Sequence, residues 1–214
     1  ESVDTKAEIL GALRKAAPNA YFFTNTSSIP ISELDRAADL GGQIVGFHFF
    51  NPPHHKRLVE LISPDEMSPE LTRLALELAN RLDLRVVHSA DQAGFISNGY
   101  FMREVRYVCA EVEEMAERGS FPAAICFLND VTRRLLLRPM GIFEVIDMVG
   151  LEVCRGIGAV MTQLLSGSDF AIPLLDKVGG SFFQYRDGRP IAVVDLDREA
   201  YVALPVAPRR EKVL

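Results

Sequence analysis

A histidine and a glutamate on either side of a tight turn are the residues of this sequence best suited to chemistry. His48 lies near the end of an apolar run over 44–49, and Glu60 lies inside a second run over 57–62, with an Asn51-Pro-Pro turn between them. Two neighbouring strands joined in this way bring a carboxylate against an imidazole ring, which orients the ring, fixes its tautomer and raises its basicity. The pair therefore predicts a general base, although spacing alone leaves open a half-buried histidine beside a solvent-facing glutamate.

Three further blocks accompany this pair along the chain. Thr-Asn-Thr-Ser-Ser occupies 24–28, Gly-Phe-Ile-Ser-Asn occupies 94–98, and Pro-Met-Gly-Ile-Phe-Glu occupies 139–144. In order with the His-Phe-Phe-Asn-Pro and Leu-Val-Glu segments, they resemble the 3-hydroxyacyl-CoA dehydrogenase family from Glu1 to about Tyr185. The resemblance implies an NAD-dependent enzyme with an acyl-CoA substrate, which reversibly oxidises (3S)-3-hydroxyacyl-CoA to 3-oxoacyl-CoA, as in fatty-acid β-oxidation.

The resemblance assigns roles to four residues. Oxidation of a secondary alcohol requires a base that takes the hydroxyl proton while a hydride leaves for the nicotinamide, and histidine titrates near neutral pH. His48 is the expected base, and Glu60 would accept the other ring N–H and stabilise the imidazolium. Ser27 and Asn98 would donate hydrogen bonds to the C3 oxygen of the substrate, which favours the charge of the transition state.

Four other residues are expected to contact the cofactor. Glu1 and Lys6 match, in type and approximate spacing, family positions that help to hold the nicotinamide ribose and the substrate. Asn25, inside the Thr-Asn-Thr-Ser turn, is a third expected contact. Asn51 has two open interpretations, since it either supports the ribose or caps the turn that it forms with the following prolines.

A Gly-rich turn between a strand and a helix is missing from the sequence. Such a turn allows backbone N–H groups to approach the pyrophosphate of a dinucleotide. The nearest match, Gly156-Ile-Gly158, lies inside a helical pattern and indicates close helix packing. By comparison with the family, the sequence therefore resembles a dehydrogenase without the first half of its cofactor domain.

The elements that must position these residues change character near Asp91. Before it, helix-like and strand-like segments alternate, which favours an α/β layer architecture. The expected helices lie over 4–16, near 30–32 and from Ser68 onward, and the expected strands over 21–23, 44–49, 57–62 and 84–88. Ser68 is the expected N-cap of its helix, because Pro69 and Glu70 follow it.

After Asp91 the apolar period is helical. The expected helices lie over 95–118, 120–135 and about 142–161, and an Asp187-Gly188 turn predicts a hairpin between 182–185 and 191–194. The expected fold is therefore an α/β partial Rossmann-like domain followed by a mostly α-helical C-terminal domain. The expected limits are 1–90 for the end of the NAD-binding domain, 91–186 for the helical domain, and 187–214 for the hairpin and a linker or tail.

Composition excludes several classes of protein. A net charge of −6 argues against a nucleic-acid-binding surface, and no apolar run approaches the roughly 18–20 residues of a membrane span. Cys109, Cys126 and Cys154 are an odd number in apolar surroundings, which is typical of reduced residues in a cytoplasmic protein. The adjacent histidines at 54–55 lack ligands at chelating spacing, so no metal is expected.

The sequence departs from the family pattern at Gly99, where arginine is usual, at Ile142, where proline is usual, and over 179–183. The paired prolines after Asn51 and the Asp-Gly hairpin resemble a longer subclass, in which an enoyl-CoA hydratase unit follows on the same polypeptide. Residues 205–210 would then be the interdomain linker. The family often dimerises through its helical domain, so a homodimer is expected.

Two other functions stay open. A catalytically silent acyl-CoA-binding relative would not need an oriented base, so the presence of Ser27, His48, Glu60 and Asn98 argues against it. A β-hydroxyacid dehydrogenase that acts on a small acid without CoA generally relies on a lysine base. The histidine–glutamate pair argues against that alternative.

Overall fold

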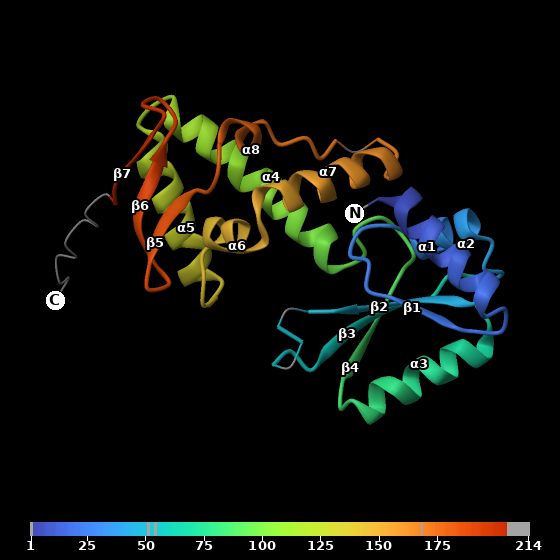
Figure 1. The fold of residues 1–214 in the computed structure, drawn as a ribbon. Coiled ribbons are helices and arrows are strands. Elements are labelled where there is room, and N and C mark those ends of the chain that lie inside the picture. Colours follow the sequence, from blue (N-terminus) through green and yellow to red (C-terminus); the bar gives the residue numbers. More distant parts are fainter. Residues whose placement is uncertain (1, 51, 54, 168, 205–214) are drawn as a thin grey trace. The chain divides into compact units, whose positions relative to one another are not determined.

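The computed structural model describes residues 2–50, 52–53, 55–167 and 169–204, which belong to two compact units (Figure 1). Unit 1 comprises the chain up to Phe101 together with Ala159–Asp169. Unit 2 comprises Met102–Gly158 and the chain from Phe170 onward. The chain passes from one unit to the other within helices α4 (Ser97–Ala116) and α7 (Leu151–Leu164), and again between Asp169 and Phe170.

Unit 1 is built on a four-stranded mixed sheet in the order β1-β2-β3-β4. The outer pairs, β1 with β2 and β3 with β4, are parallel, whereas β2 and β3 are antiparallel. The strands are β1 (Phe22–Thr24), β2 (Ile44–Phe49), β3 (Leu58–Ile62) and β4 (Arg85–Ser89), and the helices that accompany them are α1 (Val3–Ala16), α2 (Ile31–Ala38) and α3 (Pro69–Arg81). All seven elements were predicted, and their predicted starting points differ from these by no more than a few residues, but no end was predicted for α2 or α3.

The two faces of this sheet are covered by different helices. Successive side chains of a strand point to opposite faces, so the central strands β2 and β3 each contribute to two apolar clusters. One cluster joins sheet residues such as Ile44 and Ile62 to α1 and α2, and the other joins Phe47 and Leu61 to α3. Figure 1 shows α3 and the α1–α2 pair on opposite sides of the strands. This is the three-layer arrangement that the alternating sequence pattern predicts.

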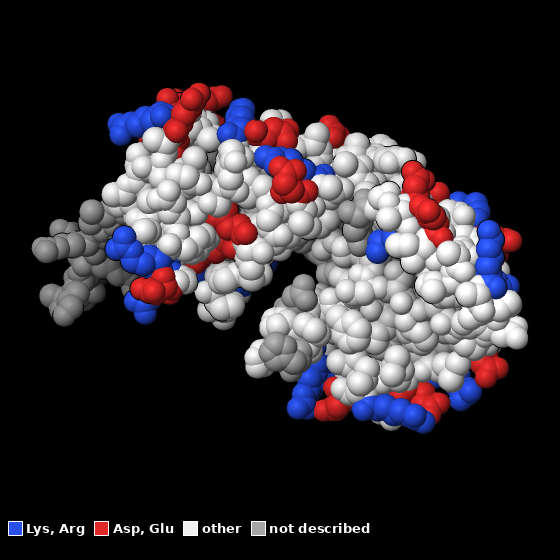
Figure 2. Space-filling model, in the orientation of Figure 1, with Lys and Arg blue, Asp and Glu red and all other residues white. Residues whose placement is uncertain are grey.

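The outer surface of α3 is charged. Arg73 pairs with Glu70 and Glu77, and Arg81 also pairs with Glu77, at the helical spacings of three and four residues. Figure 2 shows acidic and basic side chains interspersed along this edge of unit 1. Exposed pairs of this kind contribute little to stability, about 0.3–0.5 kcal/mol each, and identify the surface of α3 as solvent-facing.

The backbone N–H groups in the first turns of α2 and α3 differ in whether a side chain accepts them. Ser68 is the N-cap of α3 as predicted, but its side chain makes no capping hydrogen bond. In α2 the N-cap is Pro30, and the carboxylate of Asp91 accepts the N–H groups of Ile31 and Ser32 at 2.5 and 2.8 Å. The beginning of α2 is thus fastened by a residue that follows β4 and lies about sixty positions further along the chain.

Unit 2 combines helices with a three-stranded antiparallel sheet in the order β5-β6-β7. Its further elements are α5 (Phe121–Leu135), α6 (Ile142–Val149), α8 (Pro173–Lys177), β5 (Phe183–Arg186), β6 (Arg189–Asp195) and β7 (Ala200–Ala203). The predicted hairpin is confirmed, and Asp187 and Gly188 have φ values of 51° and 72°, which this tight turn requires. Helix α8 and strand β7 were not predicted.

The helix predicted over 142–161 is wrong as a single element. Gly150 has a φ of 96°, a conformation that ends α6, and α7 begins at the next residue. The predicted fold class is confirmed, with a Rossmann-like α/β layer followed by mostly helical structure. The predicted domain limits stay a prediction, and the predicted linker at 205–210 lies outside the described residues.

Candidate active site

His48 and Glu60 meet because of the register between two strands. In the antiparallel pair of β2 and β3, His48 lies directly opposite Glu60, so their side chains project from the same face of the sheet. His48 Nδ1 and Glu60 Oε2 are 2.6 Å apart. The Glu60 side chain is 1% exposed and the His48 side chain is 11% exposed. The contact predicted from the sequence is therefore present, while the catalytic roles of the two residues stay predictions.

The Glu60 carboxylate is held by hydrogen-bond donors on both of its oxygens. The backbone N–H groups of Ile96 and Ser97 donate to Oε1, each at 3.0 Å, and the Ser97 hydroxyl donates to Oε2 at 2.7 Å. Burial alone raises the pKa of Glu60, but the hydrogen bonds from His48 and Ser97 outweigh it and hold that pKa below its usual value. Glu60 is therefore a carboxylate at neutral pH.

The charge of Glu60 fixes the tautomer of His48. A carboxylate only accepts hydrogen bonds, so His48 Nδ1 must carry a proton and donate it to Glu60. In the neutral ring, the lone pair then lies on Nε2, to which no described residue donates a hydrogen bond. The rings of Phe50 and Phe95 lie beside the imidazole, with centroids 5.7 and 6.1 Å away. The arrangement leaves Nε2 able to accept a proton from a substrate.

The other two predicted catalytic residues are joined to each other. Asn98 Nδ2 donates a hydrogen bond to the Ser27 carbonyl oxygen at 2.9 Å. Nearby, the Gly94 N–H donates to the Ser28 carbonyl oxygen at 3.0 Å. Residues 94–98 therefore fasten both the loop after β1 and the carboxylate of Glu60, and one short segment positions all four predicted residues.

The turn that opens α4 has unusual backbone geometry. Gly94 has a φ of 80°, and Phe95 has a φ of 47°, which is uncommon for a residue with a side chain. A Cβ added to Gly94 would lie 2.8 Å from Met161 Sδ, so the position accepts only glycine without a shift of its neighbours. Non-glycine residues in this region are strained and often lie at functional sites. The strain here places Ile96 and Ser97 where their N–H groups reach Glu60.

The predicted cofactor residues are less completely described. Asn25 Oδ1 accepts a hydrogen bond from the Phe49 N–H at 2.8 Å, which fastens the end of β1 to the end of β2. Lys6 is half-buried on α1. Glu1 and Asn51 lie outside the described residues. The structure therefore gives Asn25 a structural contact beside the predicted base.

The β1–α2 connection does not fit the pyrophosphate of a dinucleotide. A pyrophosphate binds at a helix N-terminus through free backbone N–H groups. In α2 the first N–H groups are already bonded to the carboxylate of Asp91, whose charge would also repel a phosphate. The start of α2 is therefore occupied by an internal contact and is not open to a phosphate group.

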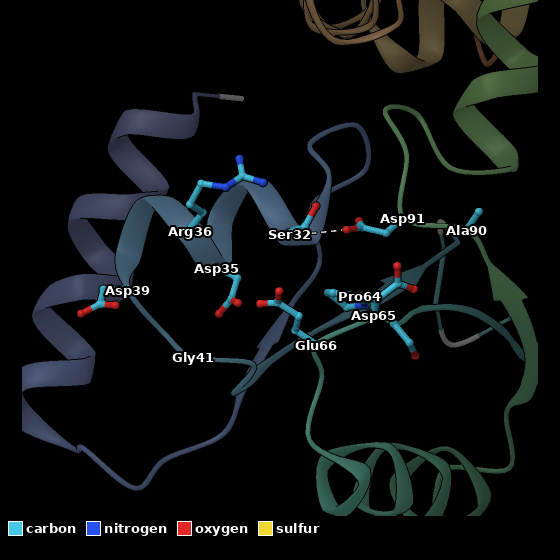
Figure 3. A pocket seen from close by; sticks show the side chains of 11 residues that line it. Ser32, Asp35, Arg36, Asp39, Gly41, Pro64, Asp65, Glu66, Ala90 and Asp91 are labelled. Carbon is cyan, nitrogen blue, oxygen red and sulfur yellow. Dashed lines mark hydrogen bonds between the residues drawn. The ribbon is translucent and has the colours of Figure 1, made fainter.

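A hollow in unit 1, of about 700 Å³, has five acidic residues among the eleven that line it (Figure 3). Asp35 and Asp91 point into this region, but each carboxylate is already bonded to backbone N–H groups, of Gly42 and of α2 respectively. Within the described ranges, no group of three or more His, Cys, Asp or Glu side chains is arranged to hold a metal ion. The carboxylates of Asp35 and Asp91 thus stabilise the local backbone.

Ser97 was missed by the sequence analysis. It lies in the variable position of the Gly-Phe-Ile-x-Asn block, so the motif gave no reason to select it. Its only sequence signal is a hydroxyl directly before Asn98, at the start of a predicted helix. The contact with Glu60 depends on a tertiary approach between residues 37 positions apart.

A buried histidine–glutamate pair on an α/β layer defines a site for proton transfer. Residues 1–92 match the family model for the 3-hydroxyacyl-CoA dehydrogenase NAD binding domain. Over 162 residues the chain is 32% identical to the "Probable 3-hydroxybutyryl-CoA dehydrogenase" of Deinococcus radiodurans, which covers 75% of this chain and 56% of that protein. The chain belongs to the 3-hydroxyacyl-CoA dehydrogenase family, as its motifs predicted.

Two further comparisons extend over most of the chain. The crystal structure of FadB2 from M. tuberculosis has a TM-score of 0.71 and 29% sequence identity, over 83% of this chain and 61% of that one. The "Fatty acid oxidation complex subunit alpha" of Shewanella sp. strain ANA-3 is 25% identical over 217 residues, which are 94% of this chain and 29% of that protein. The chain thus spans little more than half of the D. radiodurans dehydrogenase and under a third of the Shewanella protein. No helix in the described part of the chain has the length and apolar character needed to cross a membrane.

Proposed function

We propose that this chain provides the acid–base part of an NAD-dependent 3-hydroxyacyl-CoA dehydrogenase, which reversibly oxidises a (3S)-3-hydroxyacyl-CoA to the 3-oxoacyl-CoA. The observation that carries the proposal is the 2.6 Å contact between His48 Nδ1 and Glu60 Oε2, which leaves Nε2 as the free base. The substrate class comes from the family to which the chain belongs. NAD, when bound, would accept the hydride from C3.

In the oxidative direction, His48 Nε2 takes the proton of the C3 hydroxyl group. The imidazole becomes a cation, and the adjacent Glu60 carboxylate stabilises that charge at a site with little access to water. In the reductive direction the same imidazolium returns the proton to the forming alkoxide. A base that titrates near neutral pH serves both directions.

Ser27 and Asn98 would orient the C3 oxygen. The Asn98 amide has two N–H groups, and its bond to the Ser27 carbonyl oxygen uses one of them. The second N–H and the Ser27 hydroxyl are groups that could donate to an oxygen on which negative charge develops during reduction. Donors fixed in advance in this way stabilise the transition state more than the ground state.

The test follows NADH absorbance after addition of acetoacetyl-CoA, with the chain as given and with the complete gene product. His48→Ala is expected to lower kcat/KM by about 10²–10⁴-fold, the usual contribution of a general acid or base. His88→Ala is the matched control, because His88 is an exposed histidine on β4 and is not part of the pair. Equal loss in both variants, or turnover unaffected by His48→Ala, would contradict the assigned base.

Absence of turnover by the complete gene product, with acyl-CoA still bound, would instead identify a silent acyl-CoA binder. Competition by free CoA provides a second distinction, because a β-hydroxyacid dehydrogenase that acts on small acids would not be inhibited by it. Competitive inhibition by CoA is therefore expected.

Two partner proposals accompany this function. The homodimer through the helical domain is tested by light scattering of the purified chain, which should give twice the mass of 23.7 kDa. An enoyl-CoA hydratase unit on the same polypeptide is supported by the similarity to the Shewanella subunit, of which this chain spans only 29%. Sequencing the gene beyond the codon for Leu214 tests it, and an immediate stop codon would remove it.

A further inference from the structure

Ser97 bonds to the same carboxylate oxygen that holds the imidazole. Its hydroxyl donates to Glu60 Oε2 at 2.7 Å, and His48 Nδ1 lies 2.6 Å from that oxygen. The backbone N–H of Ser97 donates separately to Glu60 Oε1 at 3.0 Å. Ser97 therefore makes two contacts with Glu60, and only the hydroxyl contact depends on which residue occupies position 97.

The hydroxyl is not required to keep Glu60 in place. Oε1 is held by the N–H groups of Ile96 and Ser97, which any non-proline residue there would supply. Oε2 is held by His48, which lies opposite Glu60 in the register of β2 and β3. The carboxylate would thus retain three of its four donors without the hydroxyl, so the particular effect of the Ser97 side chain is electrostatic.

That electrostatic effect opposes the effect of Glu60 on His48. A hydrogen bond to an ionised oxygen stabilises its negative charge and leaves less of it to attract another partner. With the Ser97 hydroxyl on Oε2, the imidazolium of His48 gains less from Glu60 than it would gain from an otherwise unbonded oxygen. The ring therefore loses its proton more readily.

The charged residues described around the pair lie on the elements packed against it. His48 is the single charged group that shifts the pKa of Glu60. Around them, Val87 on β4 lies opposite Glu60, and Arg85 lies on the same face of that strand two positions away. From the other side, Asp91 is bonded to the start of α2. Among the described residues, Ser97 is thus the uncharged side chain that donates a hydrogen bond to Glu60.

We propose that Ser97 is a positioning residue that limits the base strength of His48 by sharing Glu60 Oε2 with the imidazole. The consequence is a histidine that is unprotonated, and so able to accept the substrate proton, at a lower pH than the pair alone would allow. This catalytic consequence rests on the proposed function, whereas the effect on the histidine itself does not.

The test is an NMR titration of the histidine ring signals of the chain, with the His48 signal assigned by its loss in His48→Gln. In Ser97→Ala the pKa of His48 is expected to rise by about half a unit, the scale of one hydrogen bond to a charged group shared between partners. Ser97→Thr keeps a hydroxyl and is expected to titrate like the unsubstituted chain. Ser89→Ala is the matched control, because Ser89 is a buried serine of unit 1 whose hydroxyl bonds to the Ala90 carbonyl oxygen.

Four outcomes would overturn the proposal, and the first three are read from Ser97→Ala and Ser89→Ala. They are an unchanged His48 pKa in Ser97→Ala, a fall in that pKa, which would mean that the hydroxyl strengthens the pair, and an equal shift in Ser89→Ala. A Ser97→Thr variant that titrates like Ser97→Ala would also exclude the hydroxyl as the cause. None of these readings requires turnover, so they are independent of the proposed function.

The catalytic consequence has its own measurement. In the active form, the acid limb of the kcat/KM profile for alcohol oxidation should move to higher pH in Ser97→Ala by the same amount as the His48 titration. A titration that shifts while the profile does not would retain the effect of Ser97 on His48 and refute the role of His48 as the base.

Discussion

Two buried glutamates, one in each unit, accept similar hydrogen bonds from the backbone but have different side-chain partners. Glu60 is 1% exposed and Glu144 is 8% exposed. Each carboxylate accepts backbone N–H groups at the beginning of a helix, Glu60 at α4 and Glu144 from Gly141 at α6. In both cases the carboxylate accepts N–H groups that have no acceptor within their own helix.

The side-chain partners distinguish the two sites. Glu60 is bonded to the imidazole of His48, a side chain that can gain or lose a proton, whereas Glu144 Oε2 accepts from Asn129 Nδ2 at 3.0 Å and pairs with Arg133 at 3.9 Å. Neither an amide nor a guanidinium group titrates near neutral pH. The same way of stabilising a buried acid therefore produces a site for chemistry in unit 1 and a rigid junction in unit 2.

The junction in unit 2 replaces a missing helix cap. Gly141 is the N-cap of α6 and has no side chain with which to accept N–H groups. Asn129 Oδ1, from α5, accepts those of Phe143 and Glu144 at 3.0 and 3.3 Å. The Thr132 hydroxyl accepts the N–H of Ile142 at 3.0 Å. Asn129 and Thr132 of α5 thus hold the beginning of α6 against α5.

The largest expected effect separates the two acids by activity. Glu60→Gln removes the charge that stabilises the imidazolium and places an amide N–H among donors, so kcat/KM with acetoacetyl-CoA should fall by about 10²-fold. Glu144→Gln, measured on folded protein, should leave kcat/KM near that of the unsubstituted chain. Equal losses in the two variants would show that the comparison does not describe function.

A second prediction concerns stability in unit 2. Gly141→Ala should lower the free energy of unfolding by about 1–3 kcal/mol, because the added Cβ would overlap the backbone and side-chain oxygens of Asn129. Gly156→Ala is the control, since its Cβ would meet no atom within 4 Å in α7. That variant should gain about 0.5–1 kcal/mol from helix propensity. Denaturant unfolding measures both, and a neutral Gly141→Ala would contradict the tight junction.

Asn129→Ala should have a somewhat smaller effect. It leaves the N–H groups of Phe143 and Glu144 without their acceptor, at a cost of about 1–2 kcal/mol in unfolding free energy. Asn80→Ala, at an exposed position of α3, is the matched control and should change stability very little. If both substitutions cost the same, Asn129 would not be the substitute cap of α6.

The smallest expected effect is in the pH dependence of stability. The pKa of Glu60 is lower in the folded chain than in the unfolded one, so its contribution is present above about pH 4.3 and is lost as pH falls through the folded-state pKa. Burial raises the pKa of Asp147. The hydrogen bonds donated by Phe182, Phe183 and Tyr185 lower that pKa, but burial outweighs them. Asp147 therefore makes the folded state relatively more stable as pH falls from its folded-state pKa toward about 3.9.

These opposite signs can be separated by substitution. Relative to the unsubstituted chain, Glu60→Gln should lose less stability on acidification from pH 7 to pH 3, and Asp147→Asn should lose more. Denaturant midpoints across this range measure both differences. If the dependence of the denaturant midpoint on pH changed in the same direction in both variants, the assigned pKa directions would be wrong.

Local structure was largely predictable from the sequence. Strand β2 has the predicted limits, 44–49, and the Asp187-Gly188 hairpin is present, because period-two apolar runs and turn residues act over a few positions. The break between α6 and α7 was missed, since Gly150 lies within a continuous helical pattern and only its backbone conformation ends the helix. Helix α8 has five residues, too few to give a periodic signal.

The sequence by itself predicted the family, the α/β layer and the two strands that carry His48 and Glu60, whereas the strand register of the structure decided between the two interpretations of that pair. Only the tertiary structure decided what holds Glu60 and α2, since Ser97 and Asp91 reach them from 37 and about 60 positions away. The physical reason is that strand and helix periodicity depends on neighbouring residues. A hydrogen bond between distant segments depends on where the packed core places them, and no local pattern records that placement.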